Sequence, residues 1–139
     1  MEYVSLFMGS VVALYLGILT VKSFLFYRIC SRYKRQGDYI ILDGTITHLH
    51  DEKKKAIKGK LEDVSYPQYS TSVNGLDLIY TSVVKHLNKK IGDTAELKYN
   101  SKTGLIWIDK DLKMLKSVIV MRILMIVGIA LITMLMFFI

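Results

Sequence analysis

The chain has 139 residues, of which 52% are hydrophobic and 22% charged, with a single proline and a formal net charge of +7. This length provides for one modest domain and excludes two. The apolar residues are concentrated at the two ends of the chain. This excludes an ordinary soluble domain, in which they would alternate with polar residues throughout.

The first apolar segment, residues 4–26, contains one charged residue, Lys22. As a helix it is about 35 Å long, enough to cross a hydrocarbon core of about 30 Å. The alternative is a pair of buried helices in a soluble core, but the remaining ~85 residues are too few to cover them on every side. A cleaved signal peptide is rejected because the chain begins Met1-Glu2 and the apolar run is long. Residues 1–36 are therefore predicted to form a transmembrane helix with a basic end.

Small residues recur every four positions in this first helix, at Gly9, Ala13 and Gly17, with Ser10 beside them. They lie along one helix face, and such a stripe lets another backbone approach closely within a bilayer. Two interpretations stay open. The stripe binds a helix of a partner protein, or it packs against the second helix of the same chain.

The end of the first helix is basic and contains the only cysteine, Cys30. A lone cysteine cannot form an internal disulfide, so the fold does not depend on an oxidising compartment. Cys30 is expected to be a passive thiol at the membrane interface, with palmitoylation as the alternative.

Between residues 37 and 110 the pattern changes to short β-rich runs separated by turn residues, which predicts a small antiparallel β barrel or sandwich. The dipeptide Asn74-Gly75 lies between two such runs and predicts a type I′ hairpin, whose two central residues need positive φ. Residues 51–60 are expected to be a solvated loop or strand end, and residues 83–90 a helical turn. The expected strands are residues 39–42, 44–50, 66–73, 76–82, 94–100 and 104–109.

Several turn and strand signatures in this region resemble those of a bacterial membrane family called domain of unknown function 3592. They are Gly44-Thr45-Ile46, then Tyr66-Pro67 leading to Asn74-Gly75, and Ile91-Gly92-Asp93 leading to Tyr99-Asn100. The chain departs from the family pattern at Ser101-Lys102-Thr103-Gly104, where the family has prolines. The resemblance covers most of the chain. It implies the order helix, small β domain, helix, and it implies no activity.

Candidate catalytic and metal-binding residues are few. His48 and His50 alternate on one strand face, but no further residue completes a convincing ligand set although Asp51 and Glu52 are adjacent. The serines lack a nucleophile-elbow context and no glycine-rich phosphate loop occurs. Trp107 is expected in the core or at the membrane interface. We therefore expect no enzyme activity, no metal and no cofactor.

The second apolar segment, residues 117–139, contains one charge, Arg122, and residues 111–139 are predicted to form the second transmembrane helix. Basic residues crowd the inner flank of each helix, which places the β domain in the cytosol and both termini outside. Attraction to anionic lipid explains these charges, at about 1 kcal/mol per basic residue. Nucleic-acid binding explains them less well, because such a surface also needs aromatic residues interleaved with the basic ones. The residues expected at lipid head groups are Lys22, Arg28, Arg32, Lys34, Arg35, Lys113, Lys116 and Arg122.

These features predict a non-catalytic accessory protein of a bacterial-type cytoplasmic membrane. Its helices and its cytosolic β domain would bind a partner membrane protein, with strand addition at an open sheet edge as the natural mode. The alternative function is a small membrane immunity protein that protects against a toxin. A homo-oligomer is compatible with the same features. A lipid-modifying enzyme built on the histidine pair is disfavoured because a general base there lacks a partner.

Overall fold

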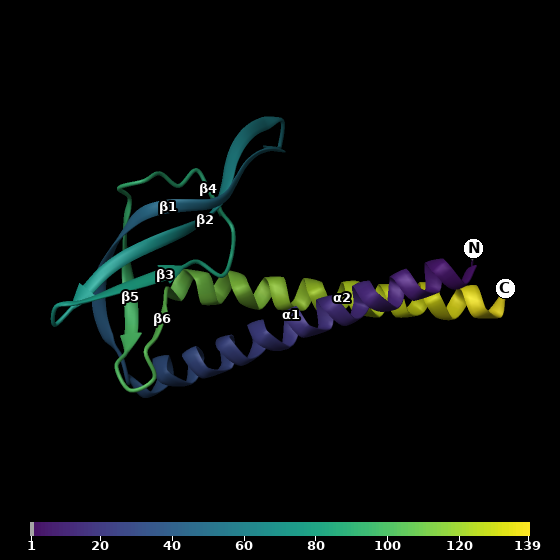
Figure 1. Ribbon diagram of the computed structural model, residues 1–139, viewed down its shortest axis with the longest axis horizontal. Coiled ribbons are helices and arrows are strands. Elements are labelled where there is room, and N and C mark those ends of the chain that lie inside the picture. Colours follow the sequence, from purple (N-terminus) through teal and green to yellow (C-terminus); the bar gives the residue numbers. More distant parts are fainter. Residues whose placement is uncertain (1) are drawn as a thin grey trace. The chain divides into compact units, whose positions relative to one another are not determined.

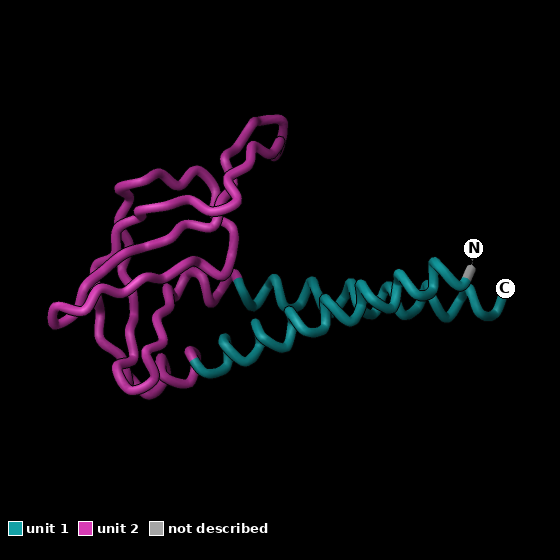
Figure 2. Tube along the Cα trace, viewed as in Figure 1, with its two compact units in different colours: residues 1–29, 115–139 teal, residues 30–114 magenta. Residues whose placement is uncertain are grey.

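The computed structural model describes residues 2–139, which divide into two compact units (Figure 2). The helical unit includes residues up to 29 and residues 115–139, and the β unit includes residues 30–114. The elements in chain order are α1 (Glu2–Gln36), β1 (Ile40–Ile57), β2 (Lys60–Val73), β3 (Leu76–Thr81), β4 (His86–Leu87), β5 (Thr94–Asn100), β6 (Leu105–Trp107) and α2 (Asp109–Phe138).

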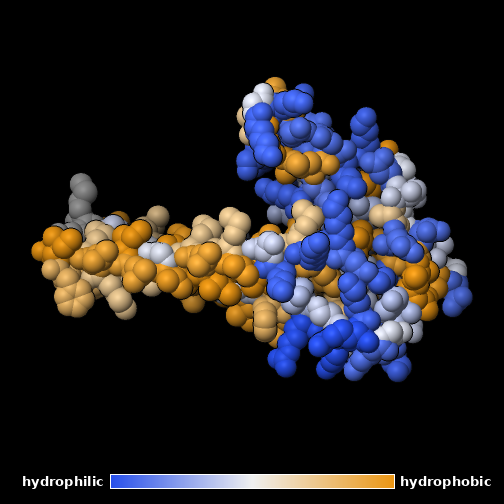
Figure 3. Space-filling model, turned by 180° about the vertical axis from the view of Figure 1, so that it is seen from behind, coloured by the Kyte–Doolittle hydropathy of each residue, from blue (hydrophilic) through white to orange (hydrophobic). Residues whose placement is uncertain are grey.

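Both helices are long and apolar enough to cross a membrane by length and composition, and the helical unit is predominantly apolar on the face seen in Figure 3. Within that unit the two helices are joined by a polar contact. The Arg122 guanidinium in α2 donates a hydrogen bond of 2.9 Å to Ser23 Oγ in α1, and a longer one of 3.5 Å to the Leu19 carbonyl oxygen. The charged group thus obtains acceptors from the neighbouring helix.

The C-terminal end of α1 is set by Gly37, whose φ of 67° is readily adopted only by glycine. Asp38 N–H donates to the Tyr33 carbonyl oxygen (3.1 Å) and Gly37 N–H to that of Lys34 (3.3 Å). This pair of bonds is the Schellman motif, which satisfies the last carbonyl groups of a helix. Helix α1 therefore continues beyond the apolar segment that ends at Phe26.

The β unit contains one antiparallel sheet with the strand order β3-β2-β1-β5-β6, and β4 pairs separately with β2 (Figure 1). The sheet is not closed, because in residues 2–139 the two outer strands β3 and β6 do not pair with each other. The antiparallel sheet between two apolar helices agrees with the expectation from sequence. The expected barrel or sandwich is not formed by the strands described, since each pairs within this single open sheet.

Trp107 is buried on one face of this sheet, and the central hydrophobic cluster of the β unit lies on the other face. Alternate residues of the central strands point into this cluster, as strand geometry requires. Trp107 at the end of β6 is fully buried, which confirms the core alternative of the two expected for it. Its ring meets Tyr39 edge-on, with ring centroids 5.9 Å apart. The buried residues of the central cluster are Ile46, Tyr69, Tyr80, Leu97, Tyr99 and Ile106.

The hairpin predicted at Asn74-Gly75 is confirmed. The two residues have φ values of 49° and 77°, and Val73 pairs with Leu76 across the turn. These positive values are those that a type I′ turn needs, so the short sequence signal was sufficient here.

A second two-residue hairpin lies where a solvated loop or strand end was expected. Strand β1 runs to Ile57 and β2 begins at Lys60, with Lys58-Gly59 at the turn and φ values of 50° and 77°. The lysine-rich strand ends pair with each other beyond a register shift between His50 and Lys53. This pairing satisfies the backbone N–H and C=O groups of both strand ends. The lysine side chains are exposed and do not prevent it.

The helical turn expected at residues 83–90 is wrong. This segment contains the short strand β4, in which Leu87 pairs with Val64 and His86 with Ser65 of β2. Strand β2 has unpaired backbone N–H and C=O groups at Val64 and Ser65. Pairing with them satisfies the backbone groups of the segment better than an isolated helical turn would.

We predict that Gly44→Ala destabilises the β unit by about 1–3 kcal/mol, the usual cost of overpacking a core. A Cβ atom at Gly44 would lie 2.6 Å from Cδ1 and 2.9 Å from Cγ of Leu97, whose side chain is fully buried. The measurement is the unfolding midpoint followed by fluorescence of Trp107, the only tryptophan. Thr47→Ala, at an exposed position of the same strand, is the control. Equal midpoints for Gly44→Ala and wild type would show that Leu97 relaxes freely.

Candidate functional site: a buried polar cluster and an open sheet edge

The carboxylate of Asp111, in the first turn of α2, is fully buried in the β unit. Its Oδ2 accepts hydrogen bonds from Tyr80 Oη (2.6 Å) and from Ser82 Oγ (2.7 Å), and its Oδ1 lies 2.6 Å from His86 Nε2. All three partners are themselves buried. We call these four residues the Asp111 cluster. It joins the start of α2 to the end of β3, the following loop and β4.

Two members of the Asp111 cluster, Tyr80 and Ser82, donate through hydroxyl groups. Burial, and next the negative charge of Asp111, raise the pKa of Tyr80 far above its usual value, so the phenol stays protonated and donates. Ser82 Oγ also lies 2.8 Å from the Val84 carbonyl oxygen, so its single proton serves one acceptor or the other. The nearby Tyr69 is affected in the same direction, since burial, and then the charges of Asp111 and Asp93, raise its pKa to about 12.

The Asp111 cluster contains the residue types of a serine hydrolase triad, but its geometry is different. In a triad the serine hydroxyl is bonded to the histidine, which removes its proton, and the acid holds the far side of the ring. Here Ser82 and His86 both bond to Asp111, through opposite carboxylate oxygens. Among residues 2–139 no hydrogen bond joins Ser82 to His86. The arrangement therefore connects the first turn of α2 to β3, the following loop and β4, and it differs from the geometry of a triad.

A second polar contact fixes the same end of α2. Lys98 Nζ on β5 lies 2.5 Å from Asp109 Oδ2 and 4.5 Å from the centroid of the Tyr39 ring. Desolvation lowers the pKa of Lys98, but the hydrogen bond and charge of Asp109, and then Tyr39, outweigh it and raise the pKa. Lys34 of α1 lies 3.7 Å from the other Asp109 oxygen. The first turn of α2 therefore contacts β5 and the end of α1 through Asp109, and β3 and β4 through Asp111.

Strand β3 is an edge of the sheet, paired on one side with β2. Its side chains alternate, so Leu78 and Tyr80 point to the core while Asp77 and Ile79 lie on the outer face. Ile79 is 63% exposed. An apolar side chain on a short edge strand with a free backbone row is the feature to which another strand adds.

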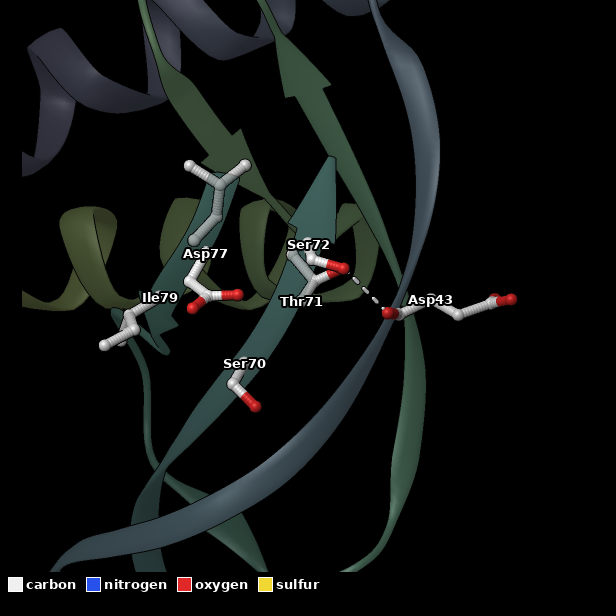
Figure 4. A pocket seen from close by; sticks show the side chains of 7 residues that line it. Asp43, Ser70, Thr71, Ser72, Asp77 and Ile79 are labelled. Carbon is white, nitrogen blue, oxygen red and sulfur yellow. Dashed lines mark hydrogen bonds between the residues drawn. The ribbon is translucent and has the colours of Figure 1, made fainter. Parts of the chain in front are cut away.

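A hollow of about 720 Å³ lies on the outer face of β2 and β3 (Figure 4). Ser70 and Ser72 of β2 pair with Ile79 and Asp77 of β3, so these four side chains share one face. Thr71 Oγ1 donates a hydrogen bond of 2.8 Å to the Asp43 carbonyl oxygen. The hollow is lined by short polar side chains, with an apolar wall formed by Leu78 and Ile79.

The predicted lipid-contacting residues are on the surface with one exception. Arg122 is half-buried and bonded to Ser23 and to the Leu19 carbonyl, as described above. The exposed ones are Lys22, Arg28, Arg32, Lys34, Arg35, Lys113 and Lys116. Lipid contact for all eight stays a prediction.

The small-residue stripe is only partly occupied within the helical unit. A Cβ on Gly9 would lie 4.0 Å from Thr133 Oγ1 of α2, whereas one on Gly17 would meet nothing within 4 Å. The half of the stripe near Gly17 is therefore open, and both interpretations of Gly9, Ala13 and Gly17 retain support.

The histidine pair His48 and His50 lies as expected on one strand, with ring centroids 4.4 Å apart. His50 Nε2 is 2.6 Å from Gln68 Oε1 on the paired strand. In residues 2–139 no group of three or more His, Cys, Asp or Glu side chains is placed to hold a metal ion. The buried histidine, His86, could not be singled out from the sequence, because its partner Asp111 is 25 positions away.

We predict that Asp111→Asn lowers the stability of the β unit by about 2–4 kcal/mol, because a buried carboxylate with three polar partners is replaced by an amide that accepts at one atom only. The measurement is the unfolding midpoint of the full chain in detergent, followed by Trp107 fluorescence. Asp77→Asn, at an exposed position of β3, is the matched control and should change little. A similar loss in both variants would contradict an anchoring role.

Comparison of the chain with protein-family models, with curated proteins and with solved structures finds no match. The resemblance to the domain of unknown function 3592 family therefore stays a prediction, based on the turn and strand signatures alone.

Proposed function

We propose that this chain is a non-catalytic accessory protein of a bacterial-type cytoplasmic membrane. In this proposal α1 and α2 cross the bilayer, the β unit lies in the cytosol and both termini lie outside. The β unit binds a partner membrane protein by strand addition at β3, and the helices bind the partner's helices. The single observation that carries the proposal is the open β3 edge, with Ile79 exposed beside the hollow on the outer face.

The membrane placement is supported by the helices and their flanks. Both helices have the length and apolarity to cross a bilayer. The basic residues that flank them on the side of the β unit, among them Arg28, Arg35 and Lys116, are exposed and available to lipid head groups. An excess of Lys and Arg on one side is the feature that keeps a connecting segment in the cytosol.

The non-catalytic role is supported by the geometry of the Asp111 cluster. A general base must be free to accept the proton that it removes. His86 instead shares its Nε2 with a buried carboxylate, and Ser82 is committed to the same carboxylate and to a backbone carbonyl. The polar groups of the cluster are used to hold the fold together.

The partner-binding role of β3 can be tested with charge substitutions. We predict that Ile79→Lys abolishes recovery of the partner in co-purification, because a charged side chain on an edge strand opposes strand addition. Ile79 is exposed, so the unfolding midpoint of the β unit should stay within the range of a surface substitution.

The matched control is Ile41→Lys, which introduces the same charge at a 55% exposed position of the central strand β1. We expect the partner that co-purifies with wild type to be lost with Ile79→Lys and retained with Ile41→Lys. Equal recovery with both variants would place the partner surface elsewhere.

The role of the helices is tested at the open half of the small-residue stripe. We predict that Ala13→Ile with Gly17→Ile prevents co-purification of the partner but leaves membrane insertion intact, since insertion depends on apolarity and close helix approach depends on small side chains.

Gly128→Ile is the matched control, because a Cβ at Gly128 also meets nothing within 4 Å. If the double variant retains the complex in full, the stripe has no part in binding, and the β3 edge would be left as the contact surface.

A further inference from the structure

A cavity of about 300 Å³ lies in the β unit between residues 85–89, here called the β4 segment, and the first turns of α2. Three lysines line it, Lys85 and Lys89 from the β4 segment and Lys110 from α2. In residues 2–139 none of the three forms a salt bridge, and the Lys85 ammonium lies 5.6 Å from the centroid of the Tyr66 ring. We call this cavity the basic pocket.

The charge balance of the basic pocket is one-sided. Asp93 is the only acidic residue in its lining, and its Oδ2 already accepts a hydrogen bond of 2.9 Å from the Lys90 backbone N–H. Like charges that converge on one concavity repel each other and raise the local positive potential, and a bound anion relieves both effects. The pocket therefore favours a negatively charged ligand.

The Asp111 cluster builds this pocket from segments that are distant in sequence. His86 lines the cavity and is held through Nε2 by Asp111, one residue after Lys110. On the other side, Asn88 N–H donates to the Asp63 carbonyl oxygen (2.8 Å), and Asp63 N–H donates to Asn88 Oδ1 (3.2 Å). The lysine-bearing backbone is thus fixed at both ends before any ligand binds, which reduces the entropic cost of binding.

We propose that the basic pocket binds a phosphate group, held by the ammonium groups of Lys85, Lys89 and Lys110. The cavity volume is at the small end of the range for ligand pockets, about 300–1,000 Å³, and suits a head group better than a whole nucleotide. Leu87 and Met114 supply an apolar wall for the carbon atoms that carry the phosphate. Two sources provide this chemistry, a phospholipid head group and a soluble phosphate compound.

The experiment uses the full chain in neutral detergent, titrated with inorganic phosphate at an ionic strength kept constant with sodium chloride. The NMR amide resonances of residues 85–89 report occupancy of the pocket. Wild type should show saturable shifts, and Lys89→Gln with Lys110→Gln should weaken binding by about tenfold or more, because two charge-assisted contacts are lost.

The matched control is Lys54→Gln with Lys58→Gln, which removes the same charge from exposed strand and turn positions outside the pocket. Lys89→Arg with Lys110→Arg keeps the charge and should retain binding, which separates loss of the ligand contact from a folding defect. Equal weakening by the pocket and control glutamine pairs would overturn the proposal, as general charge attraction would then explain the shifts.

A second arm identifies the source of the phosphate. The full chain is placed in nanodiscs of phosphatidylcholine alone or with phosphatidic acid, and the same resonances are compared. Shifts that need phosphatidic acid and Lys89 with Lys110 assign a lipid head group, and shifts with inorganic phosphate alone assign a soluble compound. Absence of pocket-dependent shifts in both arms would overturn the proposal.

Discussion

The arrangement of the β unit depends on one buried carboxylate. A charge removed from water is costly unless hydrogen bonds replace its hydration. Asp111 has no exposed surface, and three polar side chains from β3, the loop after it and β4 lie within hydrogen-bond distance of its carboxylate. None of these partners can move away without leaving the charge unsatisfied. The carboxylate therefore holds the first turn of α2 against the irregular segment that follows β3.

This anchor explains why an apolar helix starts inside a polar domain. The first turn of α2 carries Asp109 and Asp111, which suit the positive end of a helix dipole. Each is also bound by side chains of the sheet, Asp109 by Lys98 and Asp111 by the cluster. One turn of helix thus serves as part of the β unit, and the surface formed where it meets β4 is the basic pocket.

The surfaces left open by the fold are those that the proposed function uses. Strand β3 is needed internally, since its Tyr80 contributes to the core and bonds to Asp111. Its outer face does not contribute to the core or to the Asp111 cluster, and Asp77 and Ile79 are exposed there. A strand that is fixed on one side and free on the other provides a rigid template, which lowers the ordering cost for a partner. The anchoring chemistry and the proposed binding surface are consequently on opposite faces of the same strand.

Local patterns were enough to determine the two apolar helices, the antiparallel strands and the turn at Asn74-Gly75, because chain length, periodicity and positive φ are properties of neighbouring residues. For residues 51–60 they left a solvated loop and a strand end both open, and the structure has strand ends joined by the turn at Lys58-Gly59. They were not enough for the 83–90 segment, whose pairing partner is elsewhere in the chain. The identity of β3 as an open edge strand and the Asp111 cluster were decided only in the tertiary structure. No local pattern distinguishes Tyr80, Ser82 and His86 from other polar residues. Their shared partner Asp111 lies 25 or more positions later in the chain and meets them only in the folded protein. Burial gives that contact its strength, and burial is a property of the folded chain.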